Sequence, residues 1–337
     1  MPGETPAAAG ISRAFVLAAG LGTRLRPLSL ELPKPAWPLF DVPLAARVLR
    51  ALGAAGVVRA VVNLHHLPEV LRRRLEPWLP AGMDVAWSPE PRILGTGGAL
   101  LPWRGELGRG AFFLANADTY QEVDLRAVAE AHRERGAVAT LTLWPAGAGE
   151  DAPIEVDGSG RIIRFLDARA PGSAPGRPCG FTGLHLLEPE VLDAVPGAPC
   201  CINADVHRRL VARGAPVYGH LLDPSAFWSD LGTPARYVGA HRKLLDRGRV
   251  PPAPGSVVAE DGVLPSGAVV RAPAYLGPGC EVGPGARVGP FAVIGAGARV
   301  AAGAEVSRAV VWGRAVTGSV RNAVVAPSGA VLPAAGG

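Results

Sequence analysis

Residues 15–35 read F-V-L-A-A-G-L-G-T-R-L-R-P-L-S-L-E-L-P-K-P, and the rest of the chain is organised around this stretch. Its first three residues form a short apolar run that predicts a buried strand. Gly20 and Gly22 follow, where missing side chains let the backbone come close to a ligand. The N–H groups of such a loop suit a polyphosphate, and Arg24 and Lys34 add fixed positive charge nearby. The stretch therefore predicts a nucleoside triphosphate site at the carboxyl end of the first strand.

The composition indicates a globular protein of two domains. The chain has 337 residues, of which 48% are hydrophobic and 19% charged, so it can bury a sizeable core. The net charge is only +5, and no dense basic tract with interleaved aromatic residues occurs. We therefore expect no nucleic-acid partner, and the mild positive surplus suits an anionic small substrate.

Cysteine usage and the N-terminus indicate the compartment. The four cysteines form no C-x-x-C pair and have no neighbouring histidine at zinc spacing, so they are most simply isolated thiols in a reducing compartment. The first ten residues lack the basic start and apolar core of a signal peptide. No apolar run reaches the roughly 18 residues that a membrane-spanning helix needs. We expect a cytoplasmic protein without membrane contact.

Apolar strand patterns alternate with helical patterns through residue 144. This alternation predicts an α/β fold with a Rossmann-like, mostly parallel sheet and helices on both faces. A hairpin is expected at 154–165 around the turn Asp157-Gly158-Ser159-Gly160. The expected strands are 57–64, 85–87, 111–115, 138–144, 181–187 and 216–221, and the expected helices are 44–55, 69–79, 125–135, 201–213 and 234–245.

A second glycine-rich turn and two carboxylates follow other strands. Residues 88–100 read S-P-E-P-R-I-L-G-T-G-G-A-L, and two glycine loops in one domain indicate a ligand that lies across several strand ends. Asp118 ends N-A-D after the apolar strand 111–115, and Asp230 leaves another apolar run in F-W-S-D-L-G-T-P. A carboxylate at the end of a central strand often holds a hard cation. The alternative is that Asp118 merely caps the following helix.

The pattern changes after residue 246. Residues 247–255, R-G-R-V-P-P-A-P-G, predict a linker between a domain at 1–246 and another at 256–337. In the second domain an aliphatic anchor recurs every six residues, which is the hexapeptide pattern of a parallel β-helix with flat flanks suited to self-association. The anchors are Leu264, Val270, Leu276, Val282, Val288, Ile294, Val300, Val306 and Trp312, and small residues hold a second phase at Ala268, Ala274, Cys280, Ala286, Ala292, Ala298 and Ala304.

Nearly the whole chain resembles the sugar-nucleotide pyrophosphorylases, nucleotidyltransferases that join a nucleoside triphosphate to a sugar 1-phosphate. The resemblance rests on L-A-A-G-L-G-T-R-L-R-P-L with P-K-P, on L-G-T-G-G-A-L, on N-A-D, on W-S-D-L-G-T-P and on the hexapeptide tail. Within the family the chain is most similar to bacterial guanylyltransferases acting on mannose or heptose 1-phosphates and to related uridylyltransferases. The resemblance implies a C-terminal left-handed β-helix, and Mg²⁺-dependent transfer of a nucleoside monophosphate, with GTP favoured, to mannose 1-phosphate or a similar acceptor.

The resemblance also implies roles for single residues. Arg24 would stabilise charge on the departing pyrophosphate, and Lys34 would act as a mobile point charge at the phosphates. Asp118 and Asp230 would share a Mg²⁺ ion. The residues expected around the nucleotide are Leu17, Ala18, Ala19, Gly20, Gly22, Thr23, Glu90, Gly95 and Thr96. The residues expected at the sugar phosphate are Thr182, Gly183, Asp167 and Arg169.

The chain departs from the family pattern on the sugar-phosphate side. Many members carry Glu-Lys after the hairpin strand, and the lysine binds the phosphate of the sugar. The matching residues here are Asp167 and Ala168, and the neighbouring Arg169 either substitutes for the lysine or is solvated. Asp151-Ala152 also stands where Tyr-Gly usually precedes the hairpin, and N-A-D replaces N-G-D.

Other enzyme classes fit less of the sequence. A dinucleotide-dependent oxidoreductase needs G-x-G-x-x-G, but residue 25 is Leu, and a P-loop NTPase needs Gly-Lys-Ser/Thr. A hexapeptide acyltransferase generally uses a histidine base, and residues 242–337 contain no histidine. We therefore interpret that domain as structural or oligomerising, which leaves a homo-oligomer open.

Two alternatives remain within the family. The missing lysine at 168 motivates a non-catalytic regulatory subunit, although all four expected catalytic residues are present. The base is also open, because Glu90 could accept from a guanine edge but does not exclude UTP, dTTP or ATP. A uridylyl-, thymidylyl- or adenylyltransferase acting on glucose 1-phosphate or another sugar 1-phosphate is the alternative activity.

Overall fold

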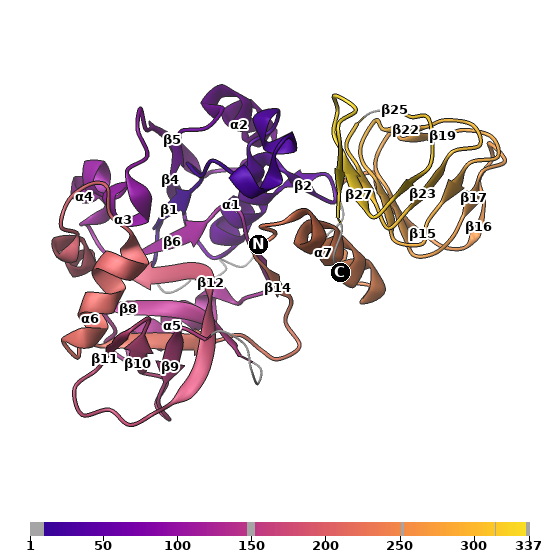
Figure 1. The fold of residues 1–337 in the computed structure, drawn as a ribbon. Coiled ribbons are helices and arrows are strands. Elements are labelled where there is room, and N and C mark those ends of the chain that lie inside the picture. The colour runs from indigo at the N-terminus through magenta and orange to yellow at the C-terminus, as the bar shows by residue number, and fades with distance from the viewer. Residues whose placement is uncertain (1–9, 147–151, 251–252, 314, 335–337) are drawn as a thin grey trace, which may run out of the picture. The chain divides into compact units, whose positions relative to one another are not determined.

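The computed structural model describes residues 10–146, 152–250, 253–313 and 315–334, and the chain divides into two compact units (Figure 1). Unit 1 comprises Met1–Gly20 and Ala45–Asp230, and unit 2 comprises Leu21–Leu44 and Leu231–Gly337. The glycine loop after the first strand is therefore shared between the units. The expected linker at 247–255 lies inside unit 2. The division into a catalytic domain at 1–246 and a β-helix domain at 256–337 stays a prediction.

A ten-stranded mixed sheet forms the centre of unit 1. Its main path runs β11-β10-β9-β12-β6-β1-β4-β5, and β8 pairs with β12 and β13. The strands are β1 (Arg13–Leu17), β4 (Arg59–Leu64), β5 (Asp84–Pro89), β6 (Phe112–Asn116), β8 (Ala139–Pro145), β9 (Ile154–Val156), β10 (Ile162–Phe165), β11 (Ala168–Arg169), β12 (Arg177–Leu187) and β13 (Val217–Leu221).

The predicted α/β class is confirmed, with parallel pairing confined to two parts of the sheet. Strands β5, β4, β1 and β6 are mutually parallel, and so are β8 and β13. Strand β12 joins these parts and is antiparallel to β6, β8 and β9. The carboxyl ends of β1, β4, β5 and β6 consequently lie along one edge, where the glycine turns and Asn116-Ala117-Asp118 emerge.

Both faces of the parallel part are buried, because alternate residues of a strand point to opposite faces. Phe15 of β1 and Val61 of β4 belong to one core cluster. Ala14 and Val16, which flank Phe15 and point to the other face, are equally buried but lie outside that cluster. The helices and helical turns of this region are α1 (Leu44–Ala54), α2 (Pro68–Leu75), η4 (Glu76–Trp78), α3 (Gly95–Gly98), η5 (Leu101–Trp103), α4 (Arg104–Leu107), α5 (Leu125–Glu134), η6 (Pro189–Ala194), the π-helix η7 (Ile202–His207) and α6 (Arg208–Ala212).

Unit 2 combines an early segment of the chain with its C-terminal part. The early segment holds η1 (Thr23–Leu25), η2 (Leu28–Leu30), η3 (Lys34–Ala36) and a small hairpin of β2 (Pro38–Leu39) with β3 (Val42–Pro43). The C-terminal part begins with helix α7 (Pro234–Asp246), where Thr233 caps the amino end by accepting from the N–H of Arg236.

A parallel β-helix completes unit 2, as the hexapeptide pattern predicts. Its strands form sheets of the order β15-β18-β21-β24-β27-β28, β16-β17-β20-β23-β26 and β19-β22-β25. The strands are β15 (Val257–Ala259), β16 (Gly262–Val263), β17 (Val269–Val270), β18 (Ala274–Leu276), β19 (Glu281–Val282), β20 (Arg287–Val288), β21 (Ala292–Ile294), β22 (Arg299–Val300), β23 (Glu305–Ser307), β24 (Val310–Val311), β25 (Ala315–Val316), β26 (Val320–Arg321), β27 (Ala323–Val325) and β28 (Val331–Pro333).

The six-residue period ends before Trp312. In the first coils paired residues lie 18 positions apart, as Ala274 and Ala292 do, so three hexapeptides make one turn. Ile294 pairs with Val311, only 17 positions later. Val311 therefore joins the buried core of the β-helix, and Trp312 does not. The prediction that Trp312 is an inward-pointing anchor is wrong, because one residue fewer in this coil shifts the phase.

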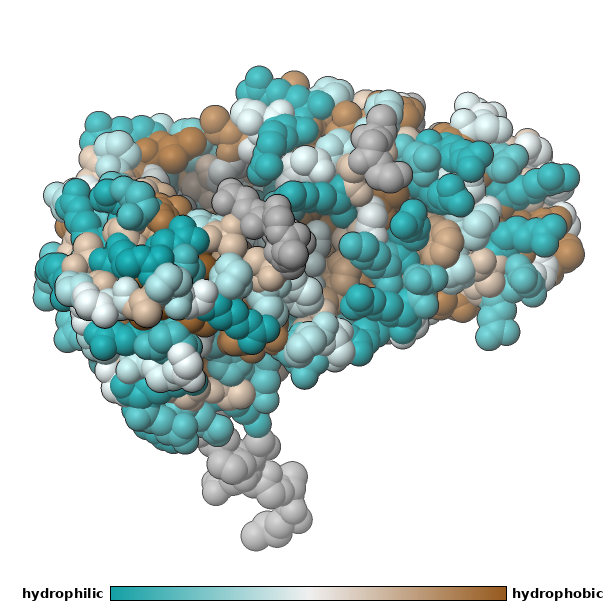
Figure 2. Space-filling model, turned by 60° about the horizontal axis from the view of Figure 1, so that its bottom comes forward, coloured by the Kyte–Doolittle hydropathy of each residue, from teal (hydrophilic) through white to brown (hydrophobic). Residues whose placement is uncertain are grey.

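The surface carries mixed polarity. On the face drawn in Figure 2, hydrophobic residues are scattered among hydrophilic ones. Within the described parts of the chain, no helix combines the length and the apolar character that a membrane crossing requires.

Candidate functional site

Polar contacts from neighbouring strands fix the backbone at the end of β1. The N–H of Ala18 donates to Asn63 Oδ1 at 2.6 Å, and the carbonyl of Leu17 accepts from the N–H of Ala117 at 3.0 Å. The two alanines after Leu17 are buried, whereas Gly20 is exposed. Among the described residues, no atom lies within 4 Å of a Cβ built on Gly20. The loop is therefore held firmly by its neighbours and faces open space at Gly20.

Glu90 belongs to the same network of strand ends. Its carboxylate accepts from Asn63 Nδ2 at 2.7 Å and from the N–H of Leu94 at 2.9 Å. Both Asn63 and Glu90 are buried. Glu90 thus links the ends of β1 and β4 to the second glycine turn, and a contact from Glu90 to a base stays a prediction. Sequence analysis missed Asn63, although a polar residue in the apolar run V-V-N-L is a signal because buried polar groups need partners.

The second glycine turn packs against residues 200–202. The N–H of Gly97 donates to the carbonyl of Cys200 at 2.8 Å, and Thr96 Oγ1 accepts from the N–H of Ile202 at 2.9 Å. Gly95 has φ +77°, and a Cβ there would overlap the Cys200 carbonyl, so this position requires glycine. The structure explains these residues by packing, and their nucleotide contacts stay predictions.

Asp118 and Asp230 flank a two-stranded ribbon that joins distant parts of the chain. Its strands are β7 (Tyr120–Gln121) and β14 (Trp228–Ser229), which pair antiparallel with Ser229 opposite Tyr120. Asp230 directly follows Ser229, and Asp118 stands two positions before Tyr120. The fold thus brings these half-buried carboxylates to the same end of one ribbon.

The competing interpretation of Asp118 as a helix cap is not supported. Helix α5 begins at Leu125, and its cap is Asp124, whose carboxylate accepts from the N–H groups of Arg126 and Ala127. Asp118 lies in the turn between β6 and β7 instead.

Thr182 ties this ribbon to the central sheet. Its hydroxyl, which is buried, donates to Gln121 Oε1 of β7 at 2.7 Å. Its carbonyl accepts from Trp228 Nε1 of β14 at 2.8 Å. Each strand of the ribbon is therefore bonded to β12 at the same residue, so Thr182 helps to set the position of Asp118 and Asp230. Its predicted contact with the sugar phosphate stays a prediction.

Gly183 lies against the turn that carries Asp118. It has φ +104°, and a Cβ there would come within 3.0 Å of Asn116 Nδ2 and 3.2 Å of Thr119 Cγ2. Both the backbone angle and the close approach require glycine.

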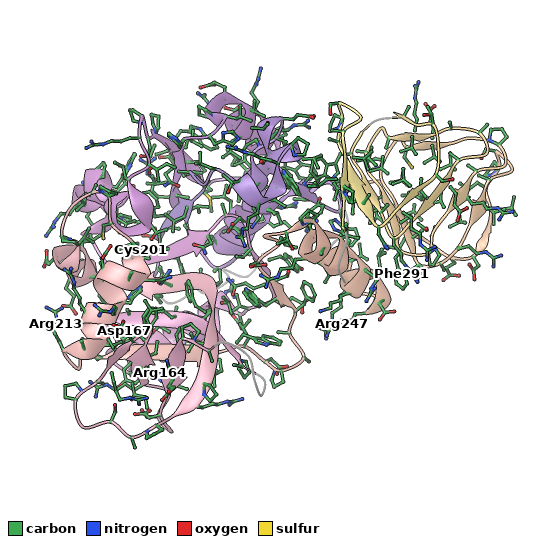
Figure 3. All side chains as sticks on the ribbon, viewed as in Figure 1. Arg164, Asp167, Cys201, Arg213, Arg247 and Phe291 are labelled. Atoms are coloured by element: carbon green, nitrogen blue, oxygen red, sulfur yellow. The ribbon has the colours of Figure 1, made fainter. Side chains whose placement is uncertain are left out.

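The remaining residues predicted for the sugar phosphate, Asp167 and Arg169, form ion pairs. Asp167, labelled in Figure 3, accepts two hydrogen bonds from Arg208, which lower the pKa of its carboxyl to about 2. Arg169 Nη2 donates to Glu155 Oε2 at 2.8 Å. Burial alone would raise the pKa of Glu155, but hydrogen bonds from the N–H of Gly176 and from two arginines lower it to about 2.

The pairing of β9 with β12 shows how far Arg169 lies from Thr182. Glu155, the partner of Arg169, lies opposite Pro178. Thr182 is four positions further along β12, or about 13 Å at ~3.3 Å per residue. To approach a sugar phosphate beside Thr182, the guanidinium of Arg169 would have to break its ion pair with Glu155. The substitution of Arg169 for the family lysine therefore stays a prediction.

In unit 2, Arg24 lies over a glycine of the W-S-D-L-G-T-P motif. A Cβ built on Gly232 would come within 3.0 Å of a terminal nitrogen of Arg24. Gly232 thus leaves room for the guanidinium, and this glycine was not identified as functional from the sequence. Arg24 and its neighbour Thr23 lie in η1 and are exposed, and their contacts with the triphosphate stay predictions.

Lys34 is held differently from Arg24. Its side chain is buried at 6% exposure within η3, between Pro33 and Pro35. Gly22 has φ +60°, and a Cβ there would come within 3.6 Å of Lys34 Cβ. Gly22 therefore packs against Lys34, whereas Thr23 and Arg24 are exposed.

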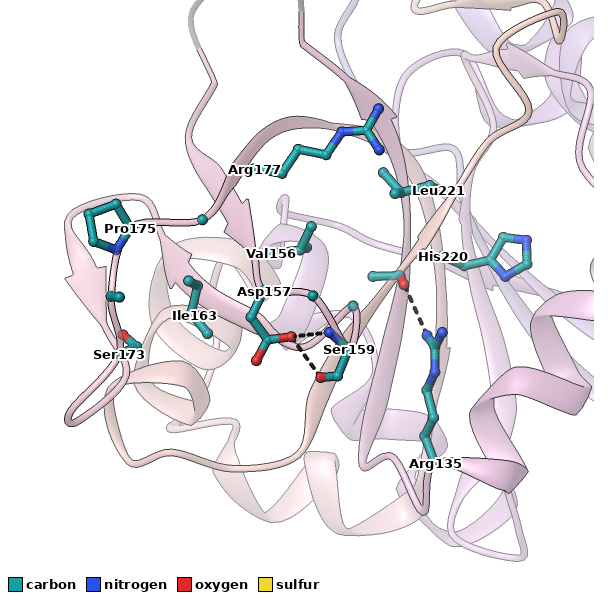
Figure 4. A pocket seen from close by; sticks show the side chains of 15 residues that line it. Arg135, Val156, Asp157, Ser159, Ile163, Ser173, Pro175, Arg177, His220 and Leu221 are labelled. Carbon is teal, nitrogen blue, oxygen red and sulfur yellow. Dashed lines mark hydrogen bonds between the residues drawn. The ribbon is translucent and has the colours of Figure 1, made fainter.

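A separate cavity of about 810 Å³ opens beside the 157–160 turn, lined by residues such as Arg135, Asp157, Arg177 and Gly219 (Figure 4). Arg135 Nη1 donates to the carbonyl of Gly219 at 3.1 Å. Residues predicted for the nucleotide, the metal or the sugar phosphate are absent from its lining. In the parts of the chain that the structure describes, no group of three or more His, Cys, Asp or Glu could hold a metal ion. A shared ion would thus rest on two carboxylates with other oxygen donors.

Comparisons with known proteins show the family of this chain. Residues 13–247 match the family model described as nucleotidyl transferase, and residues 273–308 match the bacterial transferase hexapeptide repeat. A mannose-1-phosphate guanylyltransferase of Mycobacterium tuberculosis is 30% identical over 79% of this chain and 77% of its own. A UTP–glucose-1-phosphate uridylyltransferase of Synechocystis is 30% identical over 70% of this chain and 64% of its own.

A solved structure shares the fold. HddC from Yersinia pseudotuberculosis superimposes with a TM-score of 0.57 at 21% identity, covering 69% of this chain and all of that one. The family model spans more than half of the chain and contains β1, both glycine turns, Asp118 and Asp230. The chain belongs to the nucleotidyl transferase family and carries a C-terminal hexapeptide-repeat β-helix.

Proposed function

We propose that this protein transfers a nucleoside monophosphate from a nucleoside triphosphate to a sugar 1-phosphate, releasing pyrophosphate. The observation that carries the proposal is the β7–β14 ribbon, because Asp118 and Asp230 flank the same end of it although they lie 112 positions apart in the sequence. This ribbon is tied to β12 beside the end of β6. Family membership supports the same reaction class.

The reaction needs little covalent work from the protein. An anionic oxygen of the sugar phosphate attacks the α-phosphorus, a new P–O bond forms, and the bond from the α-phosphorus to the bridging oxygen of pyrophosphate breaks. The attacking oxygen already carries negative charge, so no general base is required. The protein must position the two phosphates and neutralise their charge, and Arg24 and Lys34 are the cations we assign to the triphosphate.

Asp118 and Asp230 fit a Mg²⁺ ion by their chemistry. Both are carboxylates, which are hard oxygen donors, and both are half-buried, so they remain accessible to an ion that keeps several waters. Such an ion would neutralise charge on the reacting phosphates when bound. The hydrogen bonds that Thr182 makes to Gln121 and Trp228 tie the ribbon to β12, which supports a fixed position for the two carboxylates.

GTP and mannose 1-phosphate are the substrates we favour. Several mannose-1-phosphate guanylyltransferases are 30% or 31% identical to this chain. The uridylyltransferase relative has 30% identity as well, so UTP with glucose 1-phosphate is the second candidate. We further propose that residues 1–246 carry the chemistry and that the β-helix supports self-association.

The test is a substrate matrix. Purified protein is incubated with Mg²⁺, each of GTP, UTP, dTTP and ATP, and a panel of sugar 1-phosphates, and pyrophosphate release is followed. We expect release with GTP and mannose 1-phosphate, abolished by EDTA and restored by added Mg²⁺. Release with none of the pairs would reject the transferase and favour a non-catalytic regulatory subunit.

A further inference from the structure

Unit 2 packs the segment that carries Lys34 against α7 and the β-helix. We propose that the β-helix is a positioning element for the reaction, because it holds residues 32–41 in the conformation that presents Lys34 to the triphosphate. Trp312 and Tyr275 are the positioning residues of the β-helix. The role of Lys34 rests on the proposed function. That the β-helix fixes the conformation of residues 32–41 is a separate claim about this chain.

Trp37 is the first point at which the segment is held. Its backbone N–H donates to the carbonyl of Lys34 at 2.9 Å, and its indole Nε1 donates to the carbonyl of Leu32 at 3.0 Å. Trp37 is fully buried. A displacement of this ring would therefore move the backbone on both sides of Lys34.

The ring of Trp37 is packed between α7 and the β-helix. It makes edge contacts with Tyr237 at 5.0 Å and with Trp312 at 4.7 Å between ring centroids. Trp312 Nε1 donates to Tyr237 Oη at 3.1 Å, and the Tyr237 hydroxyl donates to the carbonyl of Pro38. Edge-to-face pairs of this kind are specific in geometry as well as favourable in energy. Three aromatic rings thus fix the chain on the C-terminal side of Lys34.

The break in the hexapeptide period is what makes this contact possible. Val311 takes the inward position in its coil, pairing with Val325 of the next coil. The following residue, Trp312, keeps its place in the ladder by donating its N–H to the carbonyl of Val325 at 2.9 Å. Its side chain packs against Trp37 rather than into the β-helix core. An uninterrupted repeat would have put position 312 inside the coil.

Asp41 provides a second attachment to the β-helix. Its carboxylate accepts from the N–H of Ala296 at 2.7 Å and from the hydroxyl of Tyr275 at 3.0 Å. Cβ atoms built on Gly277 or Gly295 would crowd this carboxylate, so the β-helix surface is shaped to admit it. Burial, assisted by Asp41, raises the pKa of Tyr275 to about 12, so the hydroxyl stays protonated and able to donate.

The experiment compares Trp312→Leu with Val288→Ala in the full-length protein. Trp312→Leu removes the ring that contacts Trp37. Val288 is a fully buried residue of the β-helix core, and that core cluster contains no residue of 32–41. We therefore expect Val288→Ala to weaken the β-helix and to leave the attachment of residues 32–41 intact. Trp312→Phe is the conservative variant, since it keeps a ring but loses the hydrogen bond to Tyr237. All measurements are made below the unfolding transition of each variant.

Two readouts are followed. The first is kcat, with KM for each substrate, in pyrophosphate release. The second is amine acetylation read by mass spectrometry, which does not depend on activity. The chain has two lysines, the buried Lys34 and the exposed Lys243, so Lys243 is an internal reference for the labelling of Lys34.

We expect Trp312→Leu to lower kcat by about 10- to 100-fold, the usual consequence of misplacing a reacting or charge-stabilising group by about 1 Å. The KM for the sugar 1-phosphate should stay near the wild-type value. Lys34 should label faster in Trp312→Leu while Lys243 is unchanged, with Trp312→Phe intermediate. In Val288→Ala both kcat and the labelling of Lys34 should match the wild type.

If Lys34 is acetylated at the wild-type rate in Trp312→Leu, Trp312 does not fix residues 32–41, whatever the activity of the variant. Equal losses of kcat in Trp312→Leu and Val288→Ala would also overturn this role of Trp312, because they would show general loss of stability. The wild type could release no pyrophosphate with any pair of nucleoside triphosphate and sugar 1-phosphate while Lys34 is still acetylated faster in Trp312→Leu. The β-helix would then fix residues 32–41, and the proposed function would be rejected.

Discussion

Arg24 and Lys34 are the two cations that we assign to the triphosphate, and they lie in contrasting surroundings. Arg24 is exposed in a helical turn, and its guanidinium lies over Gly232. Lys34 is 6% exposed between two prolines. The exposed arginine can be changed without disturbing the core, so it is the better residue for testing charge stabilisation.

Replacement of Arg24 by alanine should lower kcat by about two to three orders of magnitude, the usual cost of removing one charge-stabilising donor. The melting temperature should hardly change, because the side chain is exposed. The control is Arg26→Ala, another exposed arginine of the same loop, which should keep most of the activity. Equal activity of the two variants would remove the special role of Arg24.

Gly232→Ala tests whether the position of the Arg24 guanidinium matters, without changing Arg24 itself. A Cβ at this position would press on Arg24, with a closest approach of 3.0 Å, so the guanidinium must move. We expect a fall in kcat with little change in KM for the sugar 1-phosphate. Gly239→Ala, in α7, is the matched control because no described atom lies within 4 Å of its Cβ. An active Gly232→Ala variant would show that the position of Arg24 is not critical.

Which site residues could be predicted depends on whether their signal is local. Asp118 and Asp230 each end an apolar run, so a single stretch of sequence reveals them. Asn63 and Gly232 act through contacts with residues distant in sequence, to Ala18 and Arg24 respectively. The apolar run around Asn63 indicates that its side chain needs a polar partner, but the local sequence does not say which one.

The β7–β14 ribbon is the element on which the proposed metal site depends. Trp228→Phe removes the hydrogen bond from the ribbon to the carbonyl of Thr182 but leaves both carboxylates unchanged. We expect a higher Mg²⁺ concentration at half-maximal activity, because the carboxylates are less well positioned. Trp103→Phe is the matched control, since its indole donates instead to Ser88 Oγ at 2.8 Å. If both variants required the same Mg²⁺ concentration as the wild type, the ribbon would not position a metal site.

Most elements are predictable where apolar periodicity is strong. The strands at 154–156 and 162–165 and the helix from Leu44 agree with the sequence patterns almost residue for residue. The residues expected as one helix at 201–213 instead form a π-helix followed by a short α-helix. The antiparallel insertion of β12 was not predictable, because strand direction is set by long-range pairing rather than by local pattern.

At the scale of the whole molecule, a buried histidine pair should make stability depend on pH. His207 Nε2 lies 3.0 Å from His185 Nδ1, and both rings are buried. Burial lowers the pKa of both, that of His207 to about 3. Between pH 6.5 and 3 the unfolded chain therefore binds protons that the folded chain does not. Stability should fall with decreasing pH in this window, by up to about 1.4 kcal/mol per pH unit for each histidine.

His207→Phe tests this dependence, because it keeps a ring and removes one titrating group. Urea unfolding between pH 6.5 and 5 should show a slope of unfolding free energy against pH that is smaller by up to ~1.4 kcal/mol per unit. His207 also helps to lower the pKa of His185, so its removal changes the contribution of His185 in the same direction. An unchanged slope would mean that His207 does not stay neutral in the folded state.

The grouping of residues 21–44 with the β-helix is the feature that the sequence reveals least. The hexapeptide repeat predicts a separate domain, and its regularity makes Trp312 an expected core residue. The observed partner of Trp312 is Trp37, 275 positions earlier. A contact between residues so far apart cannot be predicted from sequence periodicity. Repeats predict how coils stack on each other, whereas a single break in the repeat decides what packs against their surface.

The most direct measurement of the central claim follows oxygen atoms through the reaction. The sugar 1-phosphate is prepared with ¹⁸O in the non-bridging oxygens of its phosphate and incubated with GTP and Mg²⁺. Attack of the sugar phosphate on the α-phosphorus predicts that all of this label is retained in the nucleoside diphosphate sugar, with one labelled atom bridging its two phosphorus atoms, and that pyrophosphate is unlabelled. Label in the pyrophosphate, or no nucleoside diphosphate sugar with any nucleotide, would contradict the account.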